Sequence, residues 1–365
     1  MPTDAVRLAA ASQWLPAGTL RIATLFSTGH SGADVSLVEH AASGRLFVLK
    51  RFGAGADRGH AEFVHRLVQH VSTRAEPHIA AVEATPAGAT LWDDGCGGLW
   101  ELSRFVAGEP VPEPDARQAA AAAAALARVH EAAASLPGHA PRSAVPRSLV
   151  ERRRRAVALG HAPWTRLALS GQPADCARDV LAADRAAELG ARVAARMAVA
   201  RETLADSGGL HFIARLVRAE PRACLVQAVL RDVWHEHVLF ADRRDCRVTG
   251  FIDAHAAGID TPATDLARLL GSWQPRAALA HLPLAERWPE AWRAYAAVRP
   301  LPADAERLIQ FLHATGVVFG LDNWFRWALA EGRRFSNERG VLQRIDRLIE
   351  ELPRAIAATG TEIVD

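Results

Sequence analysis

Lysine is almost missing from the sequence: Lys50 is the only one, and the rest of the 43 Lys and Arg residues are arginine. Arginine therefore supplies the surface cations, and the single exception ends a short apolar segment, 46–50, that has the pattern of a strand. Lysine carries a compact point charge whereas arginine carries a broad planar fork, so the two are not interchangeable at a binding site. Lys50 is a candidate binding residue, with chance survival in a biased composition as the alternative.

Cysteine, long apolar runs and net charge are also scarce, and each scarcity excludes a class of protein. The four cysteines include no Cys-x-x-Cys pair, which argues against a zinc site and a disulfide framework. No run approaches the roughly 18 apolar residues of a membrane span, and the N-terminus lacks a basic segment followed by an apolar core. A net charge of +2 is too small to indicate nucleic acid or an acidic membrane surface. We expect a cytoplasmic protein with no membrane or nucleic-acid partner.

What is present is enough apolar sequence for two lobes. Of the 365 residues, 50% are hydrophobic and 23% are charged, which is typical of a folded globular protein. The N-terminal part alternates like strands, with a glycine-bearing turn over 27–33 and one helical pattern over 57–74. A Gly/Pro-rich stretch, 106–114, then interrupts regular structure, and helical patterns dominate the remainder. The sequence predicts a small β-rich lobe over 1–105 and a larger, mostly helical lobe over 106–365.

Two carboxylates flank a predicted β-hairpin. Apolar runs over 238–240 and 248–252 are separated by a polar turn over 241–247. Asp232 precedes the first strand and Asp253 follows the second, so a hairpin would place both acids at the same end of the ribbon. Two adjacent carboxylates are costly unless a metal ion, a proton or a substrate hydroxyl lies between them. This arrangement predicts an active site.

The order of these features resembles that of the kinase-like phosphotransferases, most closely the aminoglycoside/choline/homoserine-type phosphotransferase family. Leu-Arg-Asp-Val-Trp-His-Glu-His (230–237) is similar to the catalytic loop His-Arg-Asp-x-x-x-x-Asn, and Asp-Ala-His (253–255) to the metal-binding Asp-Phe-Gly. The resemblance extends from about residue 20 to the C-terminal helices. It implies an α+β, bilobal protein-kinase-like fold with a small β-rich N-lobe and a larger, mostly helical C-lobe.

The resemblance also implies a role for each matching residue. Asp232 would accept the proton of the acceptor hydroxyl, and Asp253 would bind the Mg²⁺ that bridges the nucleotide phosphates. Lys50 would hold the α- and β-phosphates with Glu62 as its helix partner, although Glu62 also fits a solvated acid in the first turn of a helix. The other cofactor-binding residues form a loop over the phosphates and a hinge that reads the adenine edge: Gly29, Ser31 and Gly32 in the loop, and Glu101, Ser103 and Phe105 in the hinge.

Two positions depart from the family pattern. Leu230 stands where the family has histidine, and His237 where it has a metal-binding asparagine. Imidazole suits softer ions than Mg²⁺, so either Asp253 carries the metal with water filling the gap, or His237 shifts the metal preference towards ions such as Mn²⁺. Asp265 resembles the acid that braces the catalytic loop in this family, and a plain helix N-cap is its alternative.

The resemblance implies an ATP- or GTP-dependent phosphotransferase that moves the γ-phosphate to a hydroxyl of a small molecule. One alternative is a catalytically impaired, nucleotide-binding regulatory protein of the same fold. The other is a metal-dependent hydrolase, because metal-capable side chains gather near the hairpin: Asp232, His235, His237, Asp253 and His255. Arginines outnumber acids over 142–222, which favours a neutral or anionic acceptor over a polycationic aminoglycoside.

Overall fold

The computed structural model describes residues 2–16, 20–25, 33–53, 55–76, 78–160, 185–333, 335 and 337–359. The chain folds into two compact units, each made of three segments. The first unit comprises Met1–Pro141, Gln227–Ile259 and Glu290–Pro300, and the second comprises Arg142–Val226, Asp260–Pro289 and Leu301–Asp365. The lobe boundary after residue 105 stays a prediction.

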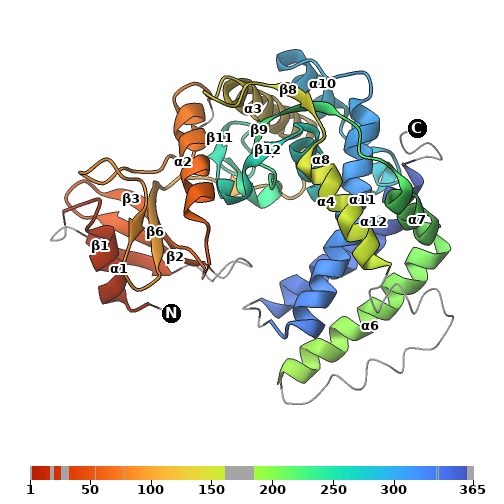
Figure 1. The fold of residues 1–365 in the computed structure, drawn as a ribbon, viewed down its shortest axis with the longest axis horizontal. Coiled ribbons are helices and arrows are strands. Elements are labelled where there is room, and N and C mark those ends of the chain that lie inside the picture. The colour runs from red at the N-terminus through yellow and green to blue at the C-terminus, as the bar shows by residue number, and fades with distance from the viewer. Residues whose placement is uncertain are drawn as a thin grey trace. The chain divides into compact units, whose positions relative to one another are not determined.

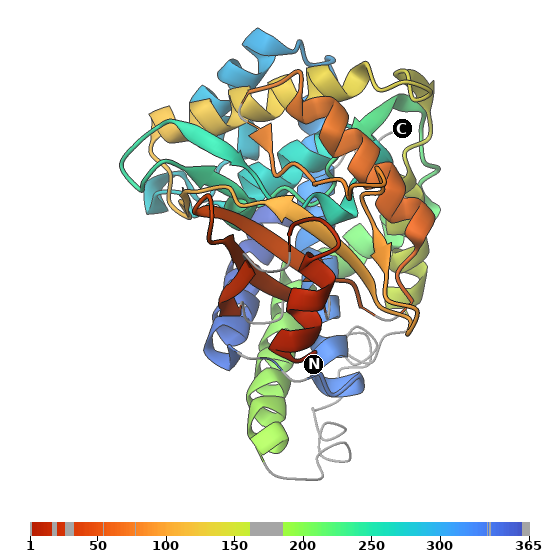
Figure 2. The same cartoon turned by 90° about the vertical axis from the view of Figure 1, so that its left-hand side faces the viewer.

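A five-stranded antiparallel sheet forms the N-terminal part of the first unit (Figures 1 and 2). Its order is β1-β2-β3-β6-β5, with bounds Leu20–Leu25, Asp34–His40, Arg45–Arg51, Leu99–Arg104 and Trp92–Asp93. Burial alternates along β2 and β3, because successive side chains of a strand point to opposite faces. Helix α1, Asp4–Ala11, contacts β1, and its N-cap is Thr3, whose hydroxyl accepts a hydrogen bond from the backbone N–H of Val6.

The two faces of this sheet differ in character. One face carries an apolar cluster that includes residues of α1 and of the turn after it: Ala10, Ala11, Trp14, Val38, Phe47, Leu49, Trp100 and Leu102. On the other face, Lys50 lies directly opposite Glu101 in the β3–β6 register, and Val48 lies opposite Ser103. Directly opposed residues of antiparallel strands project from the same face, so the sheet separates these polar side chains from the apolar cluster.

A second sheet in the first unit contains the hairpin that the sequence predicts. Its order is β4-β11-β10-β7, with bounds His78–Ile79, Val248–Phe251, Val238–Phe240 and Glu109–Pro110. Strands β10 and β11 are antiparallel, and Val238 pairs with Phe251 at the open end of the hairpin. Helix α2, Arg58–Ser72, contacts β4 and helix α3, while α3, Ala116–Ala134, contacts β11.

A third, three-stranded sheet has the order β12-β9-β8, with bounds Gly258–Asp260, Cys224–Val229 and Arg142–Ala144. The chain leaves β9 and enters the loop that carries Asp232. A single 3-10 turn, His235–His237, lies between that loop and β10, and a second one, Ala254–Ala256, follows Asp253. Helix α10, Pro289–Val298, belongs mainly to the first unit, where the Tyr295 hydroxyl lies 2.7 Å from His130 Nδ1.

The second unit consists mostly of helices (Figure 1). Their bounds are α4 Arg147–Leu159, α6 Arg185–Asp206, α7 Gly209–Arg218, α8 Ala263–Ser272, α9 Leu284–Arg287, α11 Ala305–Phe325 and α12 Glu338–Ala357. A buried apolar cluster joins α4, α6, α7, α11 and α12, and its members include the fully buried Val193, Leu204, Phe212, Val318 and Ile345.

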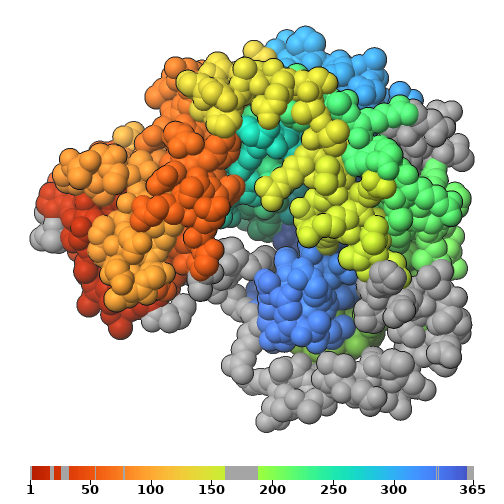
Figure 3. All heavy atoms as spheres, viewed as in Figure 1, coloured from red at the N-terminus to blue at the C-terminus, as the bar shows by residue number. Residues whose placement is uncertain are grey.

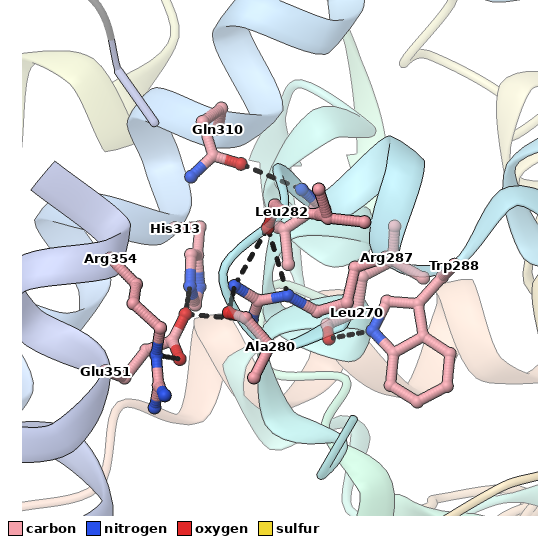
Figure 4. Close-up of polar contacts among 10 residues, drawn as sticks. Leu270, Ala280, Leu282, Arg287, Trp288, Gln310, His313, Glu351 and Arg354 are labelled. Atoms are coloured by element: carbon pink, nitrogen blue, oxygen red, sulfur yellow. Dashed lines mark hydrogen bonds and ion pairs between the residues drawn. The ribbon is translucent and has the colours of Figure 1, made fainter. Parts of the chain in front are cut away.

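A buried charged cluster connects α9, α11 and α12 of this unit (Figure 4). Arg287 Nη1 donates to Glu351 Oε1 at 2.8 Å, and His313 Nε2 lies 2.9 Å from the same oxygen. Arg287 also donates to the carbonyl oxygens of Ala280 and Leu282. Burial works to raise the pKa of Glu351, but the hydrogen bond from His313 and the charge of Arg287 lower it to about 2.

The architecture is α+β, with sheets in the N-terminal region and helices in the C-terminal part, which confirms the predicted fold class. Within the described ranges, every helix is too short or too polar to cross a membrane.

Candidate active site

The only lysine, Lys50, contacts Asp253, the carboxylate that follows the hairpin. Lys50 Nζ donates to Asp253 Oδ1 at 3.2 Å, although one residue belongs to β3 and the other follows β11. The Lys50 side chain is 12% exposed and that of Asp253 is 49% exposed, so the ammonium is shielded while the carboxylate is accessible. Burial tends to raise the pKa of Asp253, but the charge of Lys50 lowers it overall. The carboxylate is therefore ionised at neutral pH.

His255, in the 3-10 turn after Asp253, completes this group. Its Nδ1 lies 3.4 Å from Lys50 Nζ, and because an ammonium only donates, Nδ1 is the acceptor. The His255 ring stacks on Phe52, with ring centroids 5.1 Å apart and planes 4° apart. Burial and the charge of Lys50 lower the pKa of His255. A neutral imidazole thus holds the lysine without adding a second positive charge.

Glu101 supplies an acid next to Lys50 within the sheet. The two residues face each other across β3 and β6, and Glu101 Oε2 lies 2.6 Å from His65 Nε2 of α2. His65 is 2% exposed, and its Nδ1 lies 2.8 Å from Thr90 Oγ1. Burial tends to raise the pKa of Glu101, but the hydrogen bond from His65 and the charge of Lys50 lower it. Glu101 is therefore an anion fixed in place beside the lysine.

Both ends of the hairpin have an unusual backbone conformation. In the described part of the chain, the non-glycine residues with positive φ are Arg231, at 66°, and Asp253, at 56°. Arg231 directly precedes Asp232, and its side chain covers Gly258, where an added Cβ would lie 3.2 Å from Arg231 Cδ. Such conformations cost about 1–3 kcal/mol and persist where the surrounding structure enforces them, often at functional sites. One strained position is Asp253 itself, and the other directly precedes Asp232.

His237 lies between these two acids, and its hydrogen bonds define its tautomer. Its Nδ1 lies 2.7 Å from the carbonyl oxygen of Asp232, so Nδ1 carries the proton. Its Nε2 accepts the indole N–H of Trp234 at 2.8 Å and lies 3.8 Å from Asp253 Oδ2. An indole nitrogen donates only, so the lone pair of Nε2 is already engaged. The ring connects the backbone of Asp232 to the neighbourhood of the Asp253 carboxylate.

Asp253 fits a divalent ion better than His237 does. The Asp253 carboxylate is a hard oxygen ligand, is accessible and is ionised. His237 Nε2 would have to lose its bond from Trp234 before it could bind a metal. Among the described residues, no group of three or more His, Cys, Asp and Glu side chains is arranged to hold a metal ion. The phosphates of a nucleotide would have to complete a metal site at Asp253, and a hydrolytic metal centre is not supported.

The remaining predicted cofactor residues fall in different places. Three of them lie outside the described residues: Gly29, Ser31 and Gly32. Glu62, in α2, has its Oε1 3.9 Å from Arg58 Nη1 and a side chain that is 48% exposed, so the structure brings Asp253 rather than Glu62 to the lysine. Ser103 lies on the polar face of the sheet, and Phe105, 38% exposed, directly follows β6.

Two histidines of α2 were not anticipated from the sequence. His65 holds Glu101, as described above, and His60 Nε2 donates to the carbonyl oxygen of His255 at 2.9 Å. The apolar periodicity of α2 places His65 on the buried face of the helix, and a buried histidine on such a face needs a polar partner. That periodicity was the available signal, but it does not indicate which residue is the partner of His65.

A buried carboxylate after the hairpin was also missed. Asp260 is 0% exposed and accepts hydrogen bonds from the backbone N–H and the hydroxyl of Ser148, at 2.9 and 2.6 Å, and from the N–H of Thr261. Asp265 is likewise 0% exposed and lies in the first turn of α8, whose N-cap is Pro262, so Asp265 is not the N-cap itself. An acid before a Thr-Pro turn is the signal that could have found Asp260.

Sheet, hairpin and lysine together place the chain among proteins with a protein-kinase-like fold. The model of the phosphotransferase enzyme family matches residues 23–301, so the chain belongs to that family. No curated protein matches the chain.

Solved structures share the fold over nearly the whole chain. A spectinomycin phosphotransferase in complex with ADP and spectinomycin has a TM-score of 0.61 at 10% identity, covering 96% of this chain and 98% of its own. An amicoumacin kinase in complex with AMP-PNP and Ca²⁺ has a TM-score of 0.52 at 13% identity, covering 96% and 93%. A macrolide 2′-phosphotransferase from Brachybacterium faecium has a TM-score of 0.51 at 17% identity, covering 99% of each chain. The fold is the one that the sequence resemblance implied.

Proposed function

We propose that the chain transfers the γ-phosphate of ATP or GTP to a hydroxyl group of a small molecule. The observation that carries the proposal is the 3.2 Å contact between Lys50 and Asp253, which joins the strand lysine to the acid after the hairpin. During phosphoryl transfer negative charge spreads over the phosphate oxygens, so catalysis depends on positioning and charge stabilisation. A shielded ammonium beside an ionised, accessible carboxylate provides one group for phosphate oxygens and one for a cation.

In this proposal Lys50 binds the α- and β-phosphates, and Glu101 takes the part expected of Glu62. Glu101 is fixed by the 2.6 Å bond to His65, so an acid that a helix histidine holds faces Lys50 across β3 and β6. The remaining nucleotide contacts are assigned from the family resemblance alone: Gly29, Ser31 and Gly32 in the loop over the phosphates, then Ser103 and Phe105 in the hinge. The ADP and AMP-PNP complexes of proteins with this fold support nucleotide use.

Asp253 would hold a divalent ion, Mg²⁺ or Mn²⁺, and His237 would join it only if Trp234 released Nε2. When bound, such an ion neutralises charge on the nucleotide phosphates. The Ca²⁺ in the amicoumacin kinase complex is consistent with a divalent ion in proteins with this fold. The imidazole of His237 donates to the carbonyl oxygen of Asp232 and so helps to position the catalytic loop relative to Asp253.

Asp232 is the base in the proposed reaction. As the acceptor oxygen attacks the γ-phosphorus, its proton passes to the Asp232 carboxylate. The bond between the γ-phosphorus and the bridging oxygen breaks, and the nucleoside diphosphate leaves with that oxygen. The loop around Asp232 is held at both sides, by the strained Arg231 and by the 2.7 Å bond from His237.

Asp232→Asn is expected to reduce phosphate transfer by about 100-fold or more, since general-base catalysis contributes roughly 10²–10⁴-fold. Nucleotide affinity should stay nearly unchanged, because Lys50 and Asp253 are intact. The experiment measures ATP and GTP consumption with Mg²⁺ and Mn²⁺ against small alcohols, sugars and amino alcohols, and nucleotide binding by calorimetry.

Asp242→Asn, in the exposed turn of the same hairpin, is the matched control and should retain full turnover. Unchanged turnover in Asp232→Asn would refute the assignment of the base. Nucleotide binding by the wild-type chain without turnover on any acceptor would indicate a regulatory nucleotide-binding protein instead.

A further inference from the structure

The second unit contains a cavity of about 370 Å³. Its walls come from helices α4 and α7, the connection between α7 and β9, and the start of α11. Figure 3 shows α4 and α7 side by side on one face of this unit. The volume lies in the range of roughly 300–1,000 Å³ that is typical of small-molecule sites. Lys50, Asp232 and Asp253 are not among its lining residues, so the cavity is separate from the proposed active site.

Anchored apolar side chains form one part of the wall. Leu216 of α7 is 2% exposed, and Phe311 of α11 packs against the buried cluster of this unit, with its ring 6.4 Å from that of Phe212. Leu149 of α4 and Leu308 of α11 complete the apolar surface. Because these side chains belong to helices that share a core, the apolar surface is preformed rather than assembled on binding.

An ion pair fixes one side of the rim. Arg153 Nη1 donates to Glu220 Oε2 at 3.0 Å, and Nη2 lies 2.8 Å from Oε1, which is a two-pronged contact. Arg153 Nε also donates to the Val217 carbonyl at 3.2 Å. This guanidinium therefore links α4 to the end of α7, and its charge is balanced by Glu220.

Two further guanidinium groups of the rim have no such partner. Arg222, in the connection between α7 and β9, and Arg307, in the first part of α11, are both exposed. Within the described ranges, neither forms an ion pair or a hydrogen bond. Asp304 is the one other acid that lines the cavity, so the rim keeps a net positive charge after Arg153 and Glu220 cancel.

We propose that this cavity binds a small organic anion, a carboxylate or a phosphate monoester that carries an apolar body. Arg222 and Arg307 bind the anionic head, because the guanidinium fork matches the oxygens of carboxylate and phosphate. The apolar body lies against Leu216 and Phe311. The inference rests on the cavity alone and is independent of the proposed phosphotransfer.

The test measures binding to the full chain by calorimetry with AMP-PNP and Mg²⁺ present, so that the nucleotide site is filled. The probes are 4-phenylbutyrate, phenyl phosphate and the neutral 4-phenylbutan-1-ol. At least one anion should bind about tenfold more tightly than the alcohol, and the double variant Arg222→Gln/Arg307→Gln should bind that anion about tenfold more weakly, a change of about 1.4 kcal/mol. The anion that binds more tightly shows whether the cavity prefers a carboxylate or a phosphate ligand.

A double variant with the same loss of charge, Arg154→Gln/Arg339→Gln, is the control. Both arginines are exposed and neither lines the cavity, so this variant should keep the wild-type affinity. The proposal is overturned if no probe binds, if the alcohol binds as tightly as both anions, or if the two double variants lose affinity equally.

Discussion

The ammonium of Lys50 contacts one carboxylate, Asp253 at 3.2 Å, and Lys50 faces a second acid, Glu101, across β3 and β6. With His255 neutral, these three charges sum to one negative charge in a partly shielded site. Opposite charges attract more strongly where water is excluded, so a divalent cation would be drawn to this group. Glu101 of β6 can therefore supply the negative charge that the family resemblance assigns to Glu62 of α2.

At this scale the hydrogen bond from Trp234 to His237 gives a test of metal preference. Trp234→Phe removes the indole N–H and keeps an aromatic ring, so Nε2 of His237 becomes available to softer ions. We expect Mn²⁺ affinity in the presence of nucleotide to rise by about tenfold relative to Mg²⁺, which is the usual size of changes around a metal ligand. Calorimetric titration of both ions measures it.

Two further variants make that measurement specific. Trp92→Phe, in β5, changes a tryptophan away from His237 and should leave both affinities unchanged. Adding His237→Gln to Trp234→Phe should abolish the gain, because the nitrogen ligand is gone. A ratio of Mn²⁺ to Mg²⁺ affinity that stays at the wild-type value in Trp234→Phe would show that Nε2 is not a latent ligand.

Single residues differ in how far the sequence could place them. Asp232 and Asp253 were predictable, since they flank a hairpin whose two apolar runs and polar turn are local features. Lys50 was predictable because it is unique. The pairing of His65 with Glu101 was not, because it depends on the β3–β6 register and on the rotation of α2, which no local pattern specifies.

At the scale of elements, local patterns predicted the bounds of the hairpin strands and of α2 to within two residues. The predicted helical segment over 57–74 corresponds to α2, Arg58–Ser72, whose N-cap Asp57 accepts the N–H of His60. The left-handed conformation of Arg231 was not predictable, since arginine does not favour it, and aspartate adopts the conformation of Asp253 only occasionally. The Arg231 side chain packs over Gly258, a tertiary contact that no local sequence pattern indicates.

The buried cluster of α9, α11 and α12 makes a prediction about pH. Because the pKa of Glu351 falls from its ordinary 4.5 to about 2 on folding, its contribution to stability is complete above pH 4.5 and is lost as the pH falls towards 2. Glu351→Gln leaves Arg287, 3% exposed, without its acid, and breaking such a buried pair costs about 3–5 kcal/mol. The difference in unfolding free energy from wild type should therefore be large at neutral pH and shrink below pH 4.5.

Urea denaturation at several pH values between neutrality and the onset of acid unfolding measures this difference. Glu306→Gln, at an exposed position of α11, removes a carboxylate without a buried partner and should change the unfolding free energy little at any pH. A difference for Glu351→Gln that stays constant down to the lowest pH would mean that Arg287 does not depend on the ionised acid.

At the scale of the whole molecule, the site residues belong to one unit that is assembled from distant parts of the chain. Lys50 lies in its first segment, Met1–Pro141, whereas Asp232 and Asp253 lie in its second, Gln227–Ile259. The sequence predicted a β-rich N-terminal part and a mostly helical remainder because strands and helices are local patterns. It did not indicate which segments group into each compact unit, since that grouping depends on contacts between residues far apart in the chain.

This division predicts where nucleotide binding stabilises the protein. A ligand at 100 times its dissociation constant stabilises the bound state by about 2.7 kcal/mol. It slows hydrogen exchange only where exchange requires local unfolding that disrupts the binding site. AMP-PNP with Mg²⁺ should therefore slow hydrogen exchange in peptides from β3, β6 and β11, and change little in α6 and α12 of the second unit. Exchange measured by mass spectrometry tests this, with Lys50→Ala/Asp253→Ala as a variant that should show no protection. Equal protection of α12, or protection that survives in the double variant, would place the nucleotide elsewhere.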